Sequence, residues 1–274
     1  MMLIAQITDL HIRPHGMLAY GVSETNLYAE HAIHALLRLD PRPECVIVTG
    51  DLTDCGLVEE YEIIRTLFDR LPMPVYCVPG NLDRREEFRS TFADLDYLPV
   101  SGLLDFVTSC GPIRIIGLDT LVPGESHGAL RSETLSFLSD TLAAAPDAPT
   151  LVMLHHPPFE TGIGHMDRVG LLEGVAEFER IIADHPQVQR VLCGHVHRAI
   201  QTIFGGTLCQ IAPSVAHQVA LDLTPDAASC FLLEAPQFLL HRFSQGRFVT
   251  HTAQVERAPG PFPFILPDDY PGRN

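Results

Sequence analysis

The sequence predicts an α/β protein with a core of two packed sheets flanked by helices. In the first part of the chain, short apolar segments alternate with stretches of helical periodicity, which is the β-α-β order of a parallel sheet. From about residue 200 onward the pattern changes to strands. We therefore expect a single domain over residues 1–255, β-rich from about 200, followed by a Pro-rich tail at 256–274 that forms an extended arm.

The first 80 residues are expected to form three strands and two helices: strands at 3–8, 45–50 and 74–80, and helices at 24–39 and 58–71. In the first helix, the apolar residues that recur at helical spacing are Leu27, Ala32, Ile33, Leu36 and Leu37, and we expect them on one buried face. Pro41 and Pro43 follow this helix and end it.

The rest of the chain continues with mixed elements. The expected order is a helix near 85–95, an antiparallel hairpin from 103–109 and 113–120, a helix at 132–145, a strand at 150–156, a helix at 175–185 and a strand at 189–195. A second hairpin is expected about Gly205–Gly206, and more strands follow to about 253.

The composition narrows the class of function. The chain carries 18 basic and 34 acidic residues, a formal net charge of −16. Such a surface repels nucleic-acid backbones and anionic membranes, which argues for a small substrate and against a nucleic-acid polymer or a membrane as partner. The sequence has no apolar run of membrane-spanning length and no signal peptide at its start, so we expect a cytoplasmic protein.

The seven cysteines are scattered without C-x-x-C spacing. Four of them lie in apolar, strand-like segments, namely Cys45, Cys77, Cys193 and Cys209. This usage is typical of buried, reduced thiols in a reducing compartment.

Polar residues of metal-binding types stand at the ends of five predicted strands. The segments are TDLH after the first strand, GDLTD after the second, GNLD after the third, and HHPP and GHVH after two later strands. Each fragment alone is weak evidence, because an isolated D-x-H or H-x-H occurs often on ordinary surfaces. Parallel α/β sheets, however, bind ligands outside the carboxyl ends of their strands, so the five segments are expected to meet at one rim.

Together these segments resemble the calcineurin-like metallophosphoesterases, whose pattern is D-x-H, G-D-x-x-[DN], G-N-H-[DE], H-H-P-P and G-H-x-H. The match spans residues 9–197. The sequence is most similar to class III cyclic-nucleotide phosphodiesterases and binuclear bacterial glycerophosphodiesterases, through DCGLVEEY (54–61), GHMD (164–167) and AHQV (216–219). The resemblance implies a four-layer α/β/β/α sandwich with mixed sheets, and an assembly of two or more copies.

The resemblance also implies a binuclear metal site bridged by Asp51. One ion would bind Asp9, His11, Asp51 and His197, and the other would bind Asp51, Asn81, His155 and His195. These oxygen and nitrogen donors suit Mn²⁺, Fe²⁺ or Fe³⁺, Zn²⁺ or Co²⁺. Two such ions can bridge a hydroxide and clamp a phosphoryl group for in-line attack. The expected catalytic residues are Asp51, Asn81 and His156, and the expected substrate-binding residues are His156, His217 and Asn81.

Two dications, Asp9, Asp51 and a bridging hydroxide leave a net charge of about +1, and Asp83 could lower it further. That charge suits a small phosphodiester such as a cyclic nucleotide like cAMP or a glycerophosphodiester, and the predicted enzyme is a phosphoric diester hydrolase.

One residue departs from the family pattern, because Leu82 stands where G-N-H-D has histidine. In the family this histidine is thought to bind substrate or protonate the leaving oxygen, and its partner is the residue that is here Asp54. Leu82 has no proton to give, so Asp54 needs another partner, such as water or Arg84. His156 or His217 could substitute. The alternatives to an active phosphodiesterase are a phosphomonoesterase and a catalytically impaired nucleotide- or metal-binding protein.

Four other features have less specific interpretations. We expect His31 and His34 to be solvated or capping residues of the first helix, and Asp119 to be structural. An ordinary strand-end position is an alternative for His217. The glycine-containing loop at 161–170 could be either a mobile rim over the site or a plain surface loop.

Overall fold

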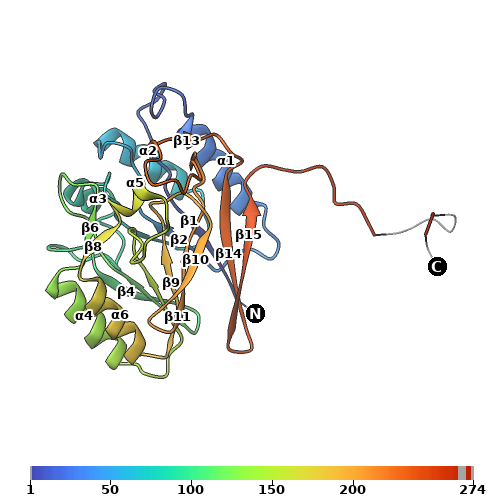
Figure 1. Cartoon of the computed structure of the whole chain (residues 1–274). Helices are drawn as coiled ribbons and strands as arrows, with labels where there is room; N and C mark the ends of the chain where they lie inside the picture. Colours follow the sequence, from blue (N-terminus) through green and yellow to red (C-terminus); the bar gives the residue numbers. More distant parts are fainter. Residues whose placement is uncertain (1, 265–269, 273–274) are drawn as a thin grey trace.

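The computed structural model describes residues 2–264 and 270–272. It shows the predicted four-layer α/β/β/α arrangement, in which two large sheets pack face to face and helices cover the outer face of each (Figure 1).

The first sheet has five strands in the order β15-β14-β1-β2-β3. Its strands are β1 (Met2–Ile7), β2 (Cys45–Thr49), β3 (Val75–Val78), β14 (Gln237–Ser244) and β15 (Arg247–Gln254). The strands β1, β2 and β3 are parallel, as the β-α-β order predicts, and β14 joins β1 in the antiparallel sense. The carboxyl ends of β1, β2 and β3 therefore share one edge.

The second sheet has six strands in the order β10-β11-β9-β7-β5-β4. Its strands are β4 (Phe106–Cys110), β5 (Ile113–Gly117), β7 (Thr150–Met153), β9 (Val188–Cys193), β10 (Ile200–Phe204) and β11 (Thr207–Ile211). The central strands β5, β7, β9 and β11 are parallel, and both predicted hairpins, β4–β5 and β10–β11, are present at the edges.

Three apolar clusters hold the four layers together. Helices α1 (Thr25–Leu37), α2 (Val58–Phe68) and α3 (Arg85–Thr91) cover the first sheet, and α4 (Ser132–Ala143) and α6 (Val175–Asp184) cover the second. The cluster between the sheets is formed by side chains from both, including Ile4 and Ile47 from one and Ile115 and Leu192 from the other. Burial of this apolar surface provides the main driving force for the packing.

The remaining elements are short. Strands β6 (Gly128–Ala129) and β8 (Leu171–Glu173) pair with each other, as do β12 (Gln218–Val219) and β13 (Phe231–Leu232). Residues 258–264 have no helix or strand and extend away from the body of the molecule (Figure 1). The rest of the predicted arm falls partly on 265–269 and 273–274, which lie outside the described residues. Within the described part of the chain, every helix is too short or too polar to span a bilayer.

Some expectations about the helices were wrong in detail. Leu27 was predicted on the buried face of α1, but its side chain is 49% exposed. The buried face of α1 is formed by Ala29, Ala32, Ile33 and Leu36 instead. Helix α3 ends at Thr91, four residues before the expected 95. The loop at 161–170 contains a short helix, α5 (Gly164–Asp167).

The four strand cysteines Cys45, Cys77, Cys193 and Cys209 are all buried free thiols, as predicted. The first-helix histidines are at the surface, where His31 contacts Glu256 and His34 contacts Arg70.

A buried glutamine joins the two sheets next to the rim where the strands end. The side chain of Gln6 in β1 donates hydrogen bonds to Thr49 Oγ1 at 3.0 Å and to the carbonyl of Cys193 at 3.1 Å. Its carbonyl oxygen accepts a hydrogen bond from His241 Nε2 at 3.0 Å. Because Thr49 ends β2 and Cys193 ends β9, Gln6 fixes the separation of two strands that belong to different sheets.

We expect Gln6→Leu to destabilise the protein by roughly 2–5 kcal/mol, because it removes the partner of His241 Nε2 and of Thr49 Oγ1 and one of the two hydrogen bonds to the carbonyl of Cys193. Urea unfolding of the purified chain measures this change. Gln201→Leu, on the exposed face of the edge strand β10, is the matched control and should change stability by no more than about 0.5 kcal/mol. Equal effects of the two substitutions would show that the Gln6 network contributes nothing.

Candidate metal centre

The structure brings all seven predicted metal-binding side chains to the rim where the strands end. They follow the carboxyl ends of β1 (Asp9, His11), β2 (Asp51), β3 (Asn81), β7 (His155) and β9 (His195, His197). Six of the seven are buried, and Asn81 is partly exposed. Three of these strands belong to one sheet and two to the other, so the site lies across the edge of the sandwich.

The backbone turns sharply at most of these positions. Five of the seven residues have positive φ angles, which only a few per cent of residues other than glycine adopt: Asp9, His11, Asp51, His195 and His197. These residues stand two or four positions beyond the ends of β1, β2 and β9, where the left-handed conformation bends the backbone away from the direction of the strand. Such backbone strain is concentrated at functional sites, where the surrounding structure maintains it.

Two glycines make room for this arrangement. A β-carbon on Gly50 would overlap the ring of His155, and one on Gly80 would overlap the carboxylate and backbone of Asp51. Glycine at each position therefore allows the loops after β2 and β3 to lie directly against the site.

On one side of Asp51, the rings of His11 and His197 face each other. Their Nε2 atoms are 3.0 Å apart. His197 Nε2 is 3.3 Å from Asp9 Oδ1, and His11 Nε2 is 3.9 Å from Asp51 Oδ2. The Nδ1 atoms point away, His11 Nδ1 to the carboxylate of Asp54 at 3.2 Å and His197 Nδ1 to the carbonyl of His217 at 2.8 Å.

On the other side of Asp51, His155 faces Asn81 and His195. His155 Nε2 is 3.5 Å from Asp51 Oδ2, 3.1 Å from Asn81 Oδ1 and 3.2 Å from His195 Nδ1. His155 Nδ1 donates to the carbonyl of Thr49 at 2.8 Å. The Nε2 of His195 is buried and has no hydrogen-bond partner among the described residues.

These contacts fix where the protons are. A carbonyl or a carboxylate only accepts, so the Nδ1 atoms of His11, His155 and His197 carry the protons, and in the neutral rings the Nε2 atoms present lone pairs. Those lone pairs face one another and the oxygens of Asp9, Asp51 and Asn81, with too few donors between them. A buried group of acceptors of this kind is stable only around positive charge, so the donor set fits bound metal cations.

The pKa values show the same attraction for positive charge. Burial alone lowers the pKa of His155, but Asp51 and Asp9 outweigh it and raise the pKa to about 9. The pKa of His11 is also raised, since the carboxylates of Asp54, Asp51 and Asp9 outweigh burial. The pKa of His195 is lowered to about 3 by burial and by His155, which keeps its ring neutral and available as a ligand.

Asp83, expected near the site, has a structural role there. Its carboxylate accepts hydrogen bonds from the backbone amides of Leu52, Thr53 and Gly80 and from the hydroxyls of Thr53 and Tyr61. It thereby joins the loop after β2 to the turn after β3. Burial and the nearby Asp51 raise the pKa of Asp83 to about 6.

Two side chains other than the expected Arg84 contact the carboxylate of Asp54. Asp54 Oδ1 lies 3.2 Å from His11 Nδ1, and Asp54 Oδ2 lies 3.3 Å from Arg13 Nη1. The side chain of Arg84 lies across Gly56. Sequence analysis did not select Arg13, because nothing in D-L-H-I-R indicates that the arginine side chain contacts the loop after β2.

The structure places the two candidate substitutes for the missing histidine differently. His156 is completely buried, its Nδ1 is 2.8 Å from Thr120 Oγ1 and its Nε2 is 3.3 Å from the carbonyl of Ser126. His217 lies beside His11 and His197, with ring centroids 5.1 and 4.8 Å away. Its Nδ1 is buried and has no hydrogen-bond partner among the described residues. His217 is thus the one with a free ring nitrogen near the metal-binding side chains.

Among the residues that the structure describes, three sets of side chains are close enough to hold a metal ion. They are Asp9, His11 and Asp51; His11, His197 and His217; and His155, His156 and His195.

The ring of Tyr20 packs against His217 at a centroid distance of 5.4 Å, and the backbone of Tyr20 has a positive φ angle. Tyr20 stands between two glycine-containing turns, and nothing in this sequence context indicated that it packs beside the metal-binding side chains.

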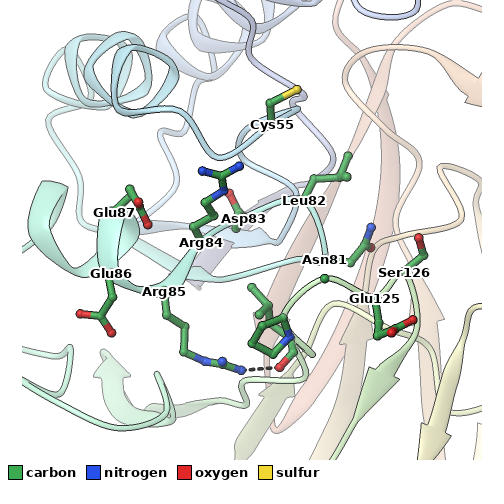
Figure 2. Close-up of a pocket in the computed structure, with 13 residues that line it drawn as sticks. Cys55, Asn81, Leu82, Asp83, Arg84, Arg85, Glu86, Glu87, Glu125 and Ser126 are labelled. Carbon is green, nitrogen blue, oxygen red and sulfur yellow. Dashed lines mark hydrogen bonds between the residues drawn. The ribbon is translucent and has the colours of Figure 1, made fainter.

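A cavity of about 600 Å³ opens beside Asn81 (Figure 2). Leu82 and Arg84 lie on one wall, and Glu125 and Ser126 on another. Asp119, predicted to be structural, is buried, and its carboxylate accepts hydrogen bonds from Nε and Nη2 of Arg85, a residue of the cavity lining. Arg85 also donates to the carbonyl of Leu121 on the cavity wall.

Comparisons with known proteins agree with this geometry. Residues 2–199 match the family model of the calcineurin-like phosphoesterases. A probable glycerophosphodiester phosphodiesterase of Arcobacter nitrofigilis is 37% identical over 264 residues, covering 96% of this chain and 97% of that protein. A probable cyclic nucleotide phosphodiesterase of Rhodopseudomonas palustris is 33% identical over 248 residues, covering 89% of each chain. The names of both relatives agree with the predicted phosphoric diester hydrolase.

Among solved structures, a dimetal phosphatase from Danio rerio superposes with a TM-score of 0.66 at 13% identity, covering 93% of this chain and 96% of that one. This likeness supports the fold. The family predicted from the five motifs is confirmed, and the chain belongs to the calcineurin-like phosphoesterases.

Proposed function

We propose that the protein is a binuclear metal-dependent phosphodiesterase that hydrolyses small phosphodiesters. The observation that carries this proposal is the convergence of imidazole nitrogens and carboxylate and amide oxygens on both sides of Asp51. One ion would be held by Asp9, His11, Asp51 and His197. The other would be held by Asp51, Asn81, His155 and His195. Asp51 contributes to both, since its Oδ2 lies within 4 Å of both His11 and His155.

When bound, the two ions supply Lewis-acid activation of a water molecule and of the phosphoryl group. The protein holds the side chains that would bind the ions in fixed orientations. The backbone amide of Leu82 donates to Asp51 Oδ1 at 2.9 Å and leaves Oδ2 directed toward His11 and His155. Asp54 and two backbone carbonyls hold His11, His155 and His197 in the tautomer whose Nε2 is free to bind.

Three observations support a small diester as the substrate. The cavity beside Asn81 holds about 600 Å³, which suits a small organic molecule. The net charge of −16 opposes binding of polyanions. The relatives are named as diesterases of glycerophosphodiesters and cyclic nucleotides. A phosphodiester of either class is therefore the first substrate to test.

Leu82 supports a second candidate, a protein that binds a nucleotide or metal and turns substrate over poorly. The leucine is partly exposed on the cavity wall, where it has no proton to give to a leaving group. The buried His156, with both nitrogens occupied, is suited to holding the Ser126 segment in place, whereas His217 has a free nitrogen. We favour the enzyme, because general acid catalysis accounts for only about 10²–10⁴-fold of a rate.

Removing metal is expected to abolish hydrolysis of bis(nitrophenyl) phosphate, and adding Mn²⁺, Zn²⁺ or Co²⁺ should restore it. Each ion at about 100 times its Kd should also raise the free energy of unfolding by about 2.7 kcal/mol. Asp51→Asn should lose both the activity and the metal-dependent stabilisation, whereas Asp147→Asn, on the exposed surface, should keep both. Full activity in the metal-free wild type would contradict the proposal.

Leu82→His is expected to raise turnover of an alkyl diester by about 10²-fold or more, because it restores a proton donor for a poor leaving group. A nitrophenyl diester, whose leaving group needs no proton, should gain much less. Leu82→Gln is the control, since it supplies a hydrogen bond without a titratable proton, and it should not give this selective gain. Equal gains on both substrates would contradict the explanation that the histidine protonates the leaving group.

A further inference from the structure

The geometry points to Arg13 as a positioning residue of the metal centre, acting on His11 through Asp54. This inference rests on the proposed metal-binding function. Arg13 is not among the ligands proposed for either of the two ions. Arg13 follows His11 by two positions on the loop after β1, and Asp54 ends the G-D-L-T-D segment after β2. A parallel bridge between Ile12 and Thr53 brings the two loops together.

A continuous series of polar contacts starts at the metal site and ends at the first turn of α2. His11 Nδ1 contacts Asp54 Oδ1 at 3.2 Å, and Asp54 Oδ2 contacts Arg13 Nη1 at 3.3 Å. The same Nη1 is 3.1 Å from Glu60 Oε1. The other oxygen of Glu60 accepts from the amides of Cys55 and Leu57, both at 3.0 Å.

Each member of this series is held in place. The side chain of Glu60 is fully buried, and those of Arg13 and Asp54 are only 12% and 13% exposed. Asn26 fixes the backbone of Arg13 by donating to its carbonyl at 2.8 Å and accepting from its amide at 2.9 Å. A guanidinium anchored by two carboxylates loses little further freedom when it orients one of them.

Arg13 is a cationic partner of Asp54, and the apolar side chain of Leu82 cannot be one. In the resembled pattern the histidine at position 82 would be the partner of Asp54, and the leucine here supplies none. Without a cation beside it, a mostly buried carboxylate would be unstable and would turn toward solvent. Arg13 keeps the carboxylate directed at His11 Nδ1. That contact keeps the His11 proton on Nδ1 and leaves Nε2 free for metal.

The test measures binding of Mn²⁺ alone to the metal-free full chain by titration calorimetry. We expect Arg13→Gln and Asp54→Asn each to weaken one of the two Mn²⁺ sites by about 10–100-fold. Because Arg13 acts through Asp54, the double variant should be no weaker than Asp54→Asn alone. Arg13→Lys, which keeps one charge but not the planar fork, should lie between wild type and Arg13→Gln.

Arg65→Gln is the matched control, because Arg65 also bridges two carboxylates, Asp69 and Asp94, but on the outer surface. It should leave both Mn²⁺ affinities unchanged. Additive effects of Arg13→Gln and Asp54→Asn, or unchanged affinity in Arg13→Gln, would overturn the inference. If Arg13→Gln does not fold, wild-type affinity in Arg13→Lys together with weakened affinity in Asp54→Asn would overturn it equally, and intermediate affinity would support it.

Failure of this inference is distinguishable from failure of the proposed function. A wild type that hydrolyses bis(nitrophenyl) phosphate while Arg13→Gln keeps full Mn²⁺ affinity contradicts only the role of Arg13. A wild type that binds two ions, loses one of them with Arg13→Gln and hydrolyses no diester contradicts only the proposed function.

Discussion

The structure depends on one electrostatic constraint: three imidazole lone pairs and the oxygens of Asp9, Asp51 and Asn81 share a buried space with almost no protons between them. Acceptors at these distances repel one another unless positive charge lies among them. The fold maintains the arrangement at several levels. Positive φ angles bend the backbone beyond the strand ends, Gly50 and Gly80 leave room for close approach, and Gln6 fixes the strands of the two sheets.

The sequence predicted parallel strands around the site and the meeting of their carboxyl ends at one rim, and the resemblance to the family supplied the choice of ligands, such as His155 rather than His156. Apolar segments identified the strands, and the rule that parallel strands carry ligands at their carboxyl ends brought Asp9, Asp51 and His155 to one rim. Periodicity could not predict which residues of α1 are buried, because alanines are buried while Leu27 is exposed. Nor could it predict the contact of Arg13 with Asp54, which depends on how two loops lie side by side.

Leu82 contributes its backbone and its side chain to different parts of the site. Its backbone amide still holds Asp51, as any residue in this turn could, while its side chain contributes an apolar surface to the cavity. The part of the site that would bind metal is therefore separate from the part that would protonate a leaving group. The resemblance connects Asp54 to leaving-group protonation. In this structure Asp54 contacts His11, a proposed metal ligand, and Arg13.

Crystals grown with Mn²⁺ and measured with anomalous scattering test the central claim most directly. The account predicts two anomalous peaks, one beside His11, His197 and Asp9 and the other beside His155, His195 and Asn81, with Asp51 in contact with both. A single peak, or two imidazole rings that remain in direct contact with no ion between the acceptors, would contradict it.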